Sequence, residues 1–310
     1  MTTRRLITRR RAIVGASLLT AGTLGVLEYE SLSGKFDHRN RKLPPYDAGM
    51  RFGESIAALS KTKEPALVHL AHSTHLLWFA GTRFLTDPWF YDPAFGALRH
   101  EVAAPVEPEG LGALDAILVT HDHADHADLR AMDQMDKRAV VIAATIELAA
   151  KIRALGFSDV SVLAPWEKRR IGGATVHAVP GLHDIYEVGY VLRGGDRSVY
   201  FAGDTRLHPD LPAIAERLTP DVAILPVDGT RITGGNLHVM TPEDAVTAAK
   251  TLGVKTIIPS HAEAEFSDPL AAHVLASTVP RARFRFQEEA ARVLPDVRCV
   301  VPRAGQLVSL

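Results

Sequence analysis

The sequence predicts an α/β protein of the α+β four-layer kind, in which two mixed β-sheets pack face to face and helices cover both outer faces. Short apolar runs rich in β-branched residues recur along the chain, and helical patterns alternate with them in each half. Each half also begins with strands that follow one another closely before this alternation starts. We expect the folded domain to span residues 65–310.

The elements follow from these patterns in order. Residues 31–64 are polar and proline-containing, which is typical of a linker, with a short helix expected over 53–59. Strands are predicted at 66–70, 75–79, 83–86, 116–120, 139–142, 160–163, 174–179, 188–192, 198–202, 222–226 and 256–259. Helices are predicted at 146–155, 213–218, 242–252 and 269–278. The helix over 242–252 has the clearest start signal, because Thr241 suits the N-cap and Pro242 the first helical position.

Composition restricts the classes of function. The 310 residues carry a formal net charge of −1, so no global positive field attracts nucleic acid, and we expect no nucleic-acid partner. Cys299 is the single cysteine, which excludes an internal disulfide and a thiolate zinc site. Any metal ion must therefore be held by histidine and carboxylate side chains.

The N-terminus differs from the rest of the chain. Five arginines and no acidic residue precede an apolar run over 12–27, which Glu28 and Glu30 end. This order is typical of an export signal, and the run is short for a membrane span. Arg9, Arg10 and Arg11 also resemble a loose twin-arginine signal. We expect residues 1–30 to be an export signal or an N-terminal membrane anchor and the protein to lie in the cell envelope; a disordered basic tail on a cytoplasmic protein is the alternative.

One short segment concentrates metal-binding chemistry. Residues 119–128 read VTHDHADHAD and follow an apolar run. His121 and His123 stand two apart, so both rings can point the same way from an extended segment. Asp125 and His126 follow closely enough to reach a neighbouring point about 3.5–4 Å away, the separation typical of two-metal sites. A solvated polar loop is the alternative interpretation.

Four ligands cannot saturate two metal ions, so the motif predicts further ligands at the ends of later strands. His183 follows ATVHAVPG, Asp204 follows SVYFAG, and His261 follows TIIPS. Each stands where an apolar run breaks at a small or turn residue, which places the side chain at one sheet edge.

These residues give the chain, from about 66 to 266, a resemblance to the metallo-β-lactamase-fold hydrolases and their H-x-H-x-D-H signature. The resemblance implies an αββα sandwich and two metal ions. It implies that His121, His123 and His183 hold one ion, that Asp125, His126 and His261 hold the other, and that Asp204 bridges both. It further implies that Asp87 and Asp128 support the ligand loop; a turn-forming role before Pro88 is the alternative for Asp87.

Longer stretches resemble one branch of this family. HLAHSTHLLWFAGTRFLTDPWF, FAGDTRLHPDL and MTPEDAVTAAKTLGVKTIIPSH look like the branch that contains the N-acylphosphatidylethanolamine-hydrolysing phospholipase D and the L-ascorbate-6-phosphate lactonase. His72 matches a histidine of that branch, although Ala71 stands where the branch has glycine, and we expect His72 to lie in the pocket or to support a ligand. The residues after His261 depart from the branch. His238 lies one residue out of register with a branch histidine, and we expect it to line the pocket.

The expected function is metal-dependent hydrolysis. Two divalent ions would activate a water for attack and polarise the scissile bond, and Asp125 or Asp204 would receive the proton. The nitrogen and oxygen ligands suit zinc first, with manganese or iron as alternatives. We expect a small-molecule or lipid substrate, first a phosphodiester of the phospholipid type. A lactone, ester or β-lactam hydrolase and a non-catalytic metal-binding sensor are the alternatives.

Overall fold

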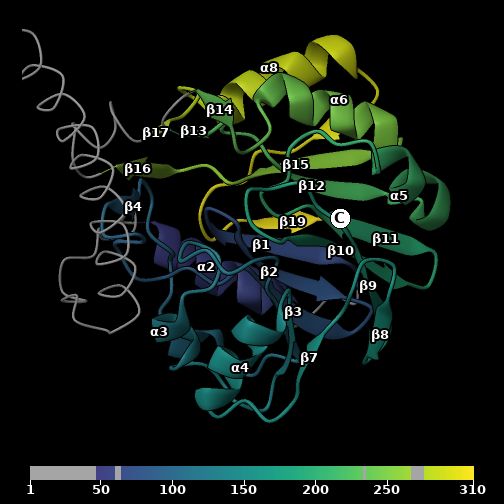
Figure 1. The fold of residues 1–310 in the computed structure, drawn as a ribbon. Helices are drawn as coiled ribbons and strands as arrows, with labels where there is room; N and C mark the ends of the chain where they lie inside the picture. The colour runs from purple at the N-terminus through teal and green to yellow at the C-terminus, as the bar shows by residue number, and fades with distance from the viewer. Residues whose placement is uncertain (1–46, 60–63, 233–234, 267–275) are drawn as a thin grey trace, which may run out of the picture.

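The computed structural model describes residues 47–59, 64–232, 235–266 and 276–310. Two large mixed sheets face each other, with helices outside both (Figure 1). The first sheet contains, in spatial order, β19 (Leu307–Ser309), β1 (Ala66–Ala71), β2 (Thr74–Phe79), β3 (Thr82–Thr86), β5 (Ala116–Leu118), β6 (Val140–Ala143) and β7 (Val160–Val162). The second contains β18 (Arg298–Cys299), β15 (Thr256–Ser260), β12 (Val222–Pro226), β11 (Arg197–Phe201), β10 (Val188–Gly194), β9 (Ala174–Pro180) and β8 (Lys168–Ile171). The predicted fold class is confirmed.

The two sheets share one plan. Antiparallel hairpins join β1, β2 and β3, and parallel pairing continues through β5, β6 and β7. In the second sheet β8 to β11 are antiparallel, and β11, β12, β15 and β18 pair in parallel. This is the sequence pattern of close strands followed by alternation with helices. The carboxyl ends of the parallel strands gather at one edge, where open α/β sheets place their ligands.

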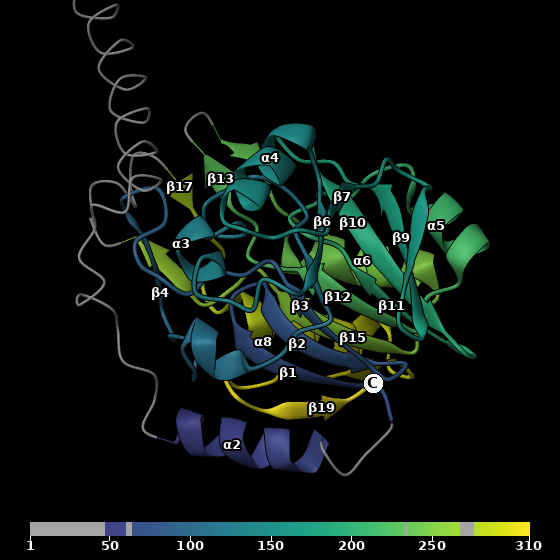
Figure 2. The ribbon, with the colours of Figure 1, turned by 90° about the horizontal axis from the view of Figure 1, so that it is seen from below.

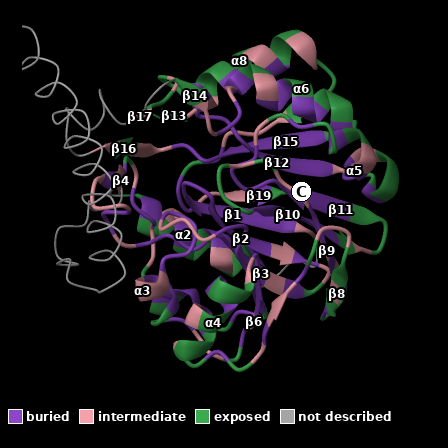
Figure 3. Ribbon diagram, in the orientation of Figure 1, coloured by how far each residue is buried: buried purple, intermediate pink, exposed green. Residues whose placement is uncertain are grey.

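Three apolar layers hold the fold together. Between the sheets, side chains such as Leu67, Phe84, Tyr190 and Ile224 are fully buried. The outer face of each sheet packs on its own helices through a separate apolar cluster. Figure 3 shows the strands as the buried interior and the helices with exposed outer faces. The near-continuous apolar runs of the inner strands follow from burial on both faces.

The helices divide between the two faces. The first face carries α2 (Ala48–Leu59), α3 (Leu129–Met132) and α4 (Ile146–Ala154), and the second carries α5 (Leu211–Leu218), α6 (Pro242–Leu252) and α8 (Ala282–Val293). The start predicted for α6 is confirmed. The Thr241 side chain accepts from the backbone N–H of Asp244, and the Asp244 side chain accepts from the backbone N–H of Thr241. This capping box satisfies two donors that a helix start otherwise leaves open.

Helix α2 lies inside the predicted linker and begins five residues before the short helix expected there. It packs beneath the first sheet, beside β19 (Figure 2). Ser55 Oγ donates to the carbonyl of Gly305 at 2.7 Å, and Phe52 and Leu59 are buried in the apolar cluster of that face. Residues 48–59 are therefore an integral part of the fold rather than a spacer.

The helix predicted over 269–278 is wrong for the two of its residues that form a described element. Residues Ala276 and Ser277 of the helix predicted over 269–278 form β17, which pairs with β13 (Arg231–Ile232), itself paired with β14 (Asn236–Leu237). Residues 269–275 lie outside the described part of the chain. The remaining elements are β4 (Leu98–His100), η2 (Pro108–Leu111) and β16 (Ala264–Phe266).

The predicted signal or anchor at 1–30 also falls outside the residues that the structure describes. Within the described ranges, no helix is long and apolar enough to cross a membrane.

Candidate metal centre

The site lies where seven chain segments leave the sheets at one edge. His72 follows β1, Asp87 follows β3, His121 to His126 follow β5, and His183 follows β9. Asp204, Asp228 and His261 follow β11, β12 and β15. The local reason is the same in each case, because an apolar strand ends and the next polar residue can turn toward the space between the sheets. All seven predicted ligands are brought together here.

The first group of metal-binding side chains contains His121, His123, His183 and Asp204, whose candidate ligand atoms lie within 4.8 Å of one another. Nδ1 of His123 is 3.0 Å from Nε2 of His121 and 3.2 Å from Nε2 of His183. Asp204 Oδ2 lies 3.8 Å from Nε2 of His121. Three imidazole nitrogens and one carboxylate are a typical zinc donor set.

The second group contains His72, Asp125, His126 and His261. Asp125 Oδ2 lies 3.6 Å from Nε2 of His72, 3.8 Å from Nε2 of His126 and 3.9 Å from Nε2 of His261. The sequence placed His72 in the pocket or in a supporting position; the structure places its ring nitrogen among the candidate ligands.

Asp204 joins the two groups. Its Oδ2 lies 3.0 Å from Nε2 of His126 and 2.9 Å from Nε2 of His261, as well as near His121 of the first group. A carboxylate in this position can contribute a donor atom to either group.

Among the described residues, several buried polar atoms in the centre have no hydrogen-bond partner. They include Nε2 of His72, Oδ1 of Asp125 and Oδ1 of Asp204. Leaving such atoms unsatisfied costs about 1–3 kcal/mol each. Lone pairs on imidazole nitrogen and carboxylate oxygen are metal-binding atoms, so the residues present fit divalent cations.

Most of the histidine rings are oriented from their far side. Nδ1 of His126 lies 2.7 Å from Asp87 Oδ2, and Nδ1 of His183 lies 3.1 Å from the carbonyl of His238. Nδ1 of His261 lies 3.1 Å from Asp228 Oδ2. A partner on Nδ1 fixes the ring angle and leaves Nε2 free to bind a metal ion.

Asp87 has the supporting position expected of it. Besides contacting His126, it accepts from the hydroxyl of Thr120 at 2.7 Å and from the Thr120 backbone N–H at 2.8 Å. The Thr120 oxygen in turn lies 3.0 Å from Nδ1 of His121. One carboxylate thus steadies a histidine of each group.

Asp128 supports the ligand loop, as expected, whereas His238 contacts the centre through its backbone carbonyl. The Asp128 carboxylate accepts from the backbone N–H groups of Phe90 and Tyr91 and caps α3, so it holds the loop rather than a histidine ring. The His238 ring pairs with Asp184, and the contact of His238 with the centre runs through its carbonyl.

Two supporting carboxylates were missed. Asp228 follows an apolar strand, as the predicted ligands do, so the same signal could have found it. Glu187 is 3% exposed and stands just before β10. Its Oε2 accepts from the backbone N–H of Asp204 at 2.8 Å and lies 3.3 Å from Nδ1 of His121. The only sequence signal for Glu187 is that an acidic residue stands directly before a strand that is buried on both faces.

The histidines of the centre fall into two classes, those with a lowered pKa and those with a raised pKa. Burial lowers the pKa of His123 to about 4 and places the pKa of His121 well below its ordinary value. Burial also opposes charge on His126 and His261, but the carboxylates facing them raise both pKa values well above 6.5. Asp204 is the largest of those contributions in each case. In the metal-free protein these two rings therefore keep their protons at neutral pH.

We expect Glu187→Ala to weaken metal binding at the first group about 10- to 100-fold, the range for residues that orient a ligand. Glu187→Gln should bind better than the alanine variant, because an amide oxygen can still accept from Asp204 and His121. Burial and Asp204 raise the pKa of Glu187, so an accepting oxygen matters more than a full charge. Zinc titration by calorimetry measures the order of the affinities of wild type, Glu187→Gln and Glu187→Ala, with the exposed Glu216→Gln as control. Unchanged affinity in the alanine variant would contradict it.

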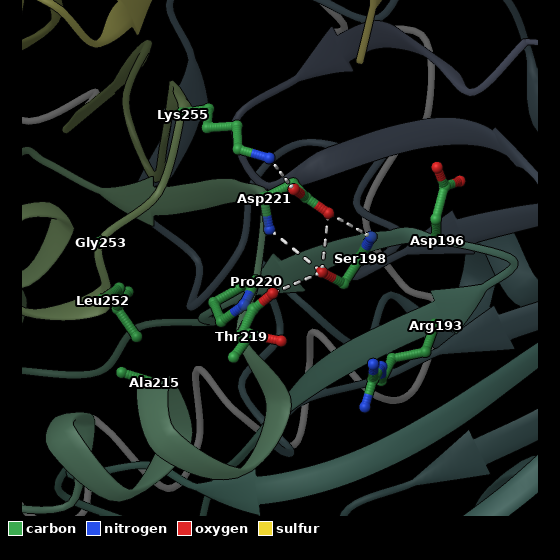
Figure 4. A pocket seen from close by; sticks show the side chains of 10 residues that line it. All are labelled: Arg193, Asp196, Ser198, Ala215, Thr219, Pro220, Asp221, Leu252, Gly253 and Lys255. Carbon is green, nitrogen blue, oxygen red and sulfur yellow. Dashed lines mark hydrogen bonds and ion pairs between the residues drawn. The ribbon is translucent and has the colours of Figure 1, made fainter.

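A second hollow lies at the opposite ends of the strands (Figure 4). Ser198, Asp221 and Lys255 meet there, and their polar groups satisfy one another. Asp221 accepts from Ser198 and from Lys255 Nζ, and Ser198 Oγ donates to Thr219. No histidine lines this hollow, so the metal-binding chemistry belongs to the other edge.

Known proteins share this arrangement of elements. The family model described as the beta-lactamase superfamily domain matches residues 82–262. A UPF0173 metal-dependent hydrolase of Caldivirga maquilingensis is 27% identical over 254 residues, which cover 78% of this chain and 96% of that protein. One of Thermofilum pendens is 34% identical over 208 residues, covering 63% of this chain and 81% of its own length.

A solved structure from Veillonella parvula, described as a possible metal-dependent hydrolase, superposes with a TM-score of 0.67. It is 22% identical and covers 80% of this chain and 100% of that one, so it supports the fold alone. The narrower resemblance to the phospholipase and lactonase branch stays a prediction. The matched model, the αββα architecture and the histidine and aspartate groups agree, and the chain belongs to the metallo-β-lactamase-fold hydrolases of the beta-lactamase superfamily.

Proposed function

We propose that this metal-dependent hydrolase uses two divalent cations, zinc first, to hydrolyse phosphodiesters. The observation that carries the proposal is the position of Asp204 Oδ2, which lies within 3.8 Å of nitrogens from both groups. A single-ion site would need no carboxylate between two complete donor sets. Two adjacent ions suit phosphodiesters, because they can stabilise the attacking and the leaving oxygen together.

The residues divide the work. His121, His123 and His183 would hold one cation, Asp125, His126 and His261 the other, and Asp204 both. When bound, the cations lower the pKa of a water and polarise the scissile bond. Asp125 Oδ1 and Asp204 Oδ1 are buried and have no hydrogen-bond partner in the described part of the chain, so either atom can receive the proton of the attacking water.

Exposed apolar residues form the rim of the metal centre and favour a substrate with an apolar part. Leu182, Ile185 and Tyr186 flank His183 and are exposed, as is Leu207 close behind Asp204. The two segments are tied together, because Leu182 N–H donates to Thr205 and Arg206 N–H donates to the Leu182 carbonyl. Exposed apolar side chains around a binding site commonly contact the ligand. A phospholipid, and membrane association through the N-terminus, are consistent with this rim.

The test is hydrolysis by protein loaded with zinc, manganese or iron. We expect turnover of bis(p-nitrophenyl) phosphate and its loss in His123→Ala, which removes a donor from the first group. His177→Ala is the matched control, because His177 lies within β9 and outside both groups. Turnover of a lactone, an ester or nitrocefin without the phosphodiester would favour the alternative hydrolases. Full metal loading without turnover of any of them would favour a sensor.

A further inference from the structure

The backbone at His72 is held in an unusual conformation. Its φ is 47°, in the left-handed region that non-glycine residues seldom adopt, and the residue is 1% exposed. The ring lies 4.2 Å from that of His261 and 5.6 Å from that of His126, measured between centroids. Such a conformation persists only where the surroundings hold it, and it turns the His72 ring into the metal centre at the end of β1.

The hydrogen bonding of the His72 ring identifies its free atom. Nδ1 lies 3.0 Å from the carbonyl oxygen of Ala262, which can only accept, so Nδ1 carries the proton. In the neutral ring Nε2 then carries a lone pair. Within the described residues this lone pair is buried without a hydrogen-bond partner, and it faces Asp125 Oδ2 at 3.6 Å, too long for a hydrogen bond. Two electron-rich atoms face each other favourably when a cation lies between them.

The spacing suits a shared ion. Donors bound at about 2.0–2.2 Å and separated by about 90–110° lie roughly 3–3.6 Å apart. His72 Nε2 and Asp125 Oδ2 fall at the end of this range, and the contacts of Asp204 with His126 and His261 fall near its start.

We propose that His72 is a direct ligand of the second cation, which then has five protein donors, while the first has four. The inference depends on the two-cation function proposed above. A ligand role for His72 makes the affinities of the two cation positions unequal, because the position with more donors binds its ion more tightly. The first cation would have fewer protein donors, so its coordination shell could expand to take the substrate.

Cobalt(II) provides a direct test, because each cobalt-bound imidazole gives a hyperfine-shifted, solvent-exchangeable N–H signal in proton NMR. The two groups contain six histidines. Wild-type protein with two equivalents of cobalt should therefore show six such signals, whereas five are expected if His72 is not a ligand. His72→Asn should lose one signal and bind the tighter equivalent on the order of 100-fold more weakly. Asparagine is chosen because it tolerates positive φ, and His177→Asn is the control.

The outcomes separate the two proposals. Wild-type protein that binds fewer than two equivalents would overturn the two-cation function, and the role of His72 with it. Two equivalents with only five signals would overturn the role of His72 alone, without relying on any variant. Wild-type affinity and an unchanged signal count in His72→Asn would do the same. Circular dichroism of the cobalt-loaded variants checks that each one is folded.

Discussion

Asp204→Asn is expected to abolish hydrolysis, lowering kcat/KM by about three orders of magnitude or more, and to reduce bound metal from two ions to one or fewer. Residues that only orient a ligand are already worth about 10- to 100-fold, and Asp204 faces both groups through one oxygen. The amide removes the negative charge from between the two groups. Kinetics and metal analysis on the same preparations measure the two effects together.

The control must change charge without touching the centre. Asp196→Asn removes a carboxylate from the exposed turn between β10 and β11 and should keep wild-type metal content and activity. An Asp204→Asn protein that retains two ions and more than a tenth of the activity would show that the groups function separately. The bridging position of Asp204 would then have no chemical role.

The positions of the ligands were predictable because each follows an apolar run. A strand that ends at a polar residue gives the edge at which the side chain emerges, and the H-x-H-x-D-H spacing gives the chemistry. The same pattern places His183, Asp204 and His261 beside the motif, although they lie 57, 78 and 135 residues after His126 in the sequence.

What the sequence did not predict depends on contacts between distant segments. The orientation of the His72 ring requires a left-handed backbone and the carbonyl of Ala262, which no local pattern encodes. Glu187 is recognisable only once Asp204 and His121 lie beside it. Helix α8 was missed for a similar reason. Its buried residues Ala282, Phe286 and Ala290 form a narrow stripe in a charged segment, and its packing on the second sheet gives that stripe its meaning.

Removing the metal is expected to destabilise the protein, and to do so more at pH 8 than at pH 6. A ligand at 1,000 times its Kd stabilises the folded state by about 4 kcal/mol. Binding requires neutral imidazoles, whereas the raised pKa values of His126 and His261 keep both rings protonated in the metal-free protein. Protons therefore compete with the metal. While both rings are protonated, the apparent affinity should rise up to about 100-fold per pH unit, or tenfold for each displaced proton.

The metal-free protein should change in the opposite direction. Its His126 and His261 have folded-state pKa values well above 6.5, so the stability they contribute is fully present below that pH and is lost as pH rises through the folded values. Each ring can remove up to about 1.4 kcal/mol per pH unit on this slope. The pKa of Asp204 is lowered well below 3.8, so its contribution does not change between pH 6 and 8.

Thermal unfolding at pH 6, 7 and 8, with zinc and after chelation, measures both effects. The gap in Tm between loaded and metal-free protein should widen with pH, since the loaded protein gains affinity while the metal-free protein loses its charged contacts. His261→Ala should narrow that gap, because it removes a metal donor and one of the two protonated rings that face Asp204. A gap that is constant across this range would mean that no proton is displaced on binding, and would contradict the placement of His126 and His261 as ligands.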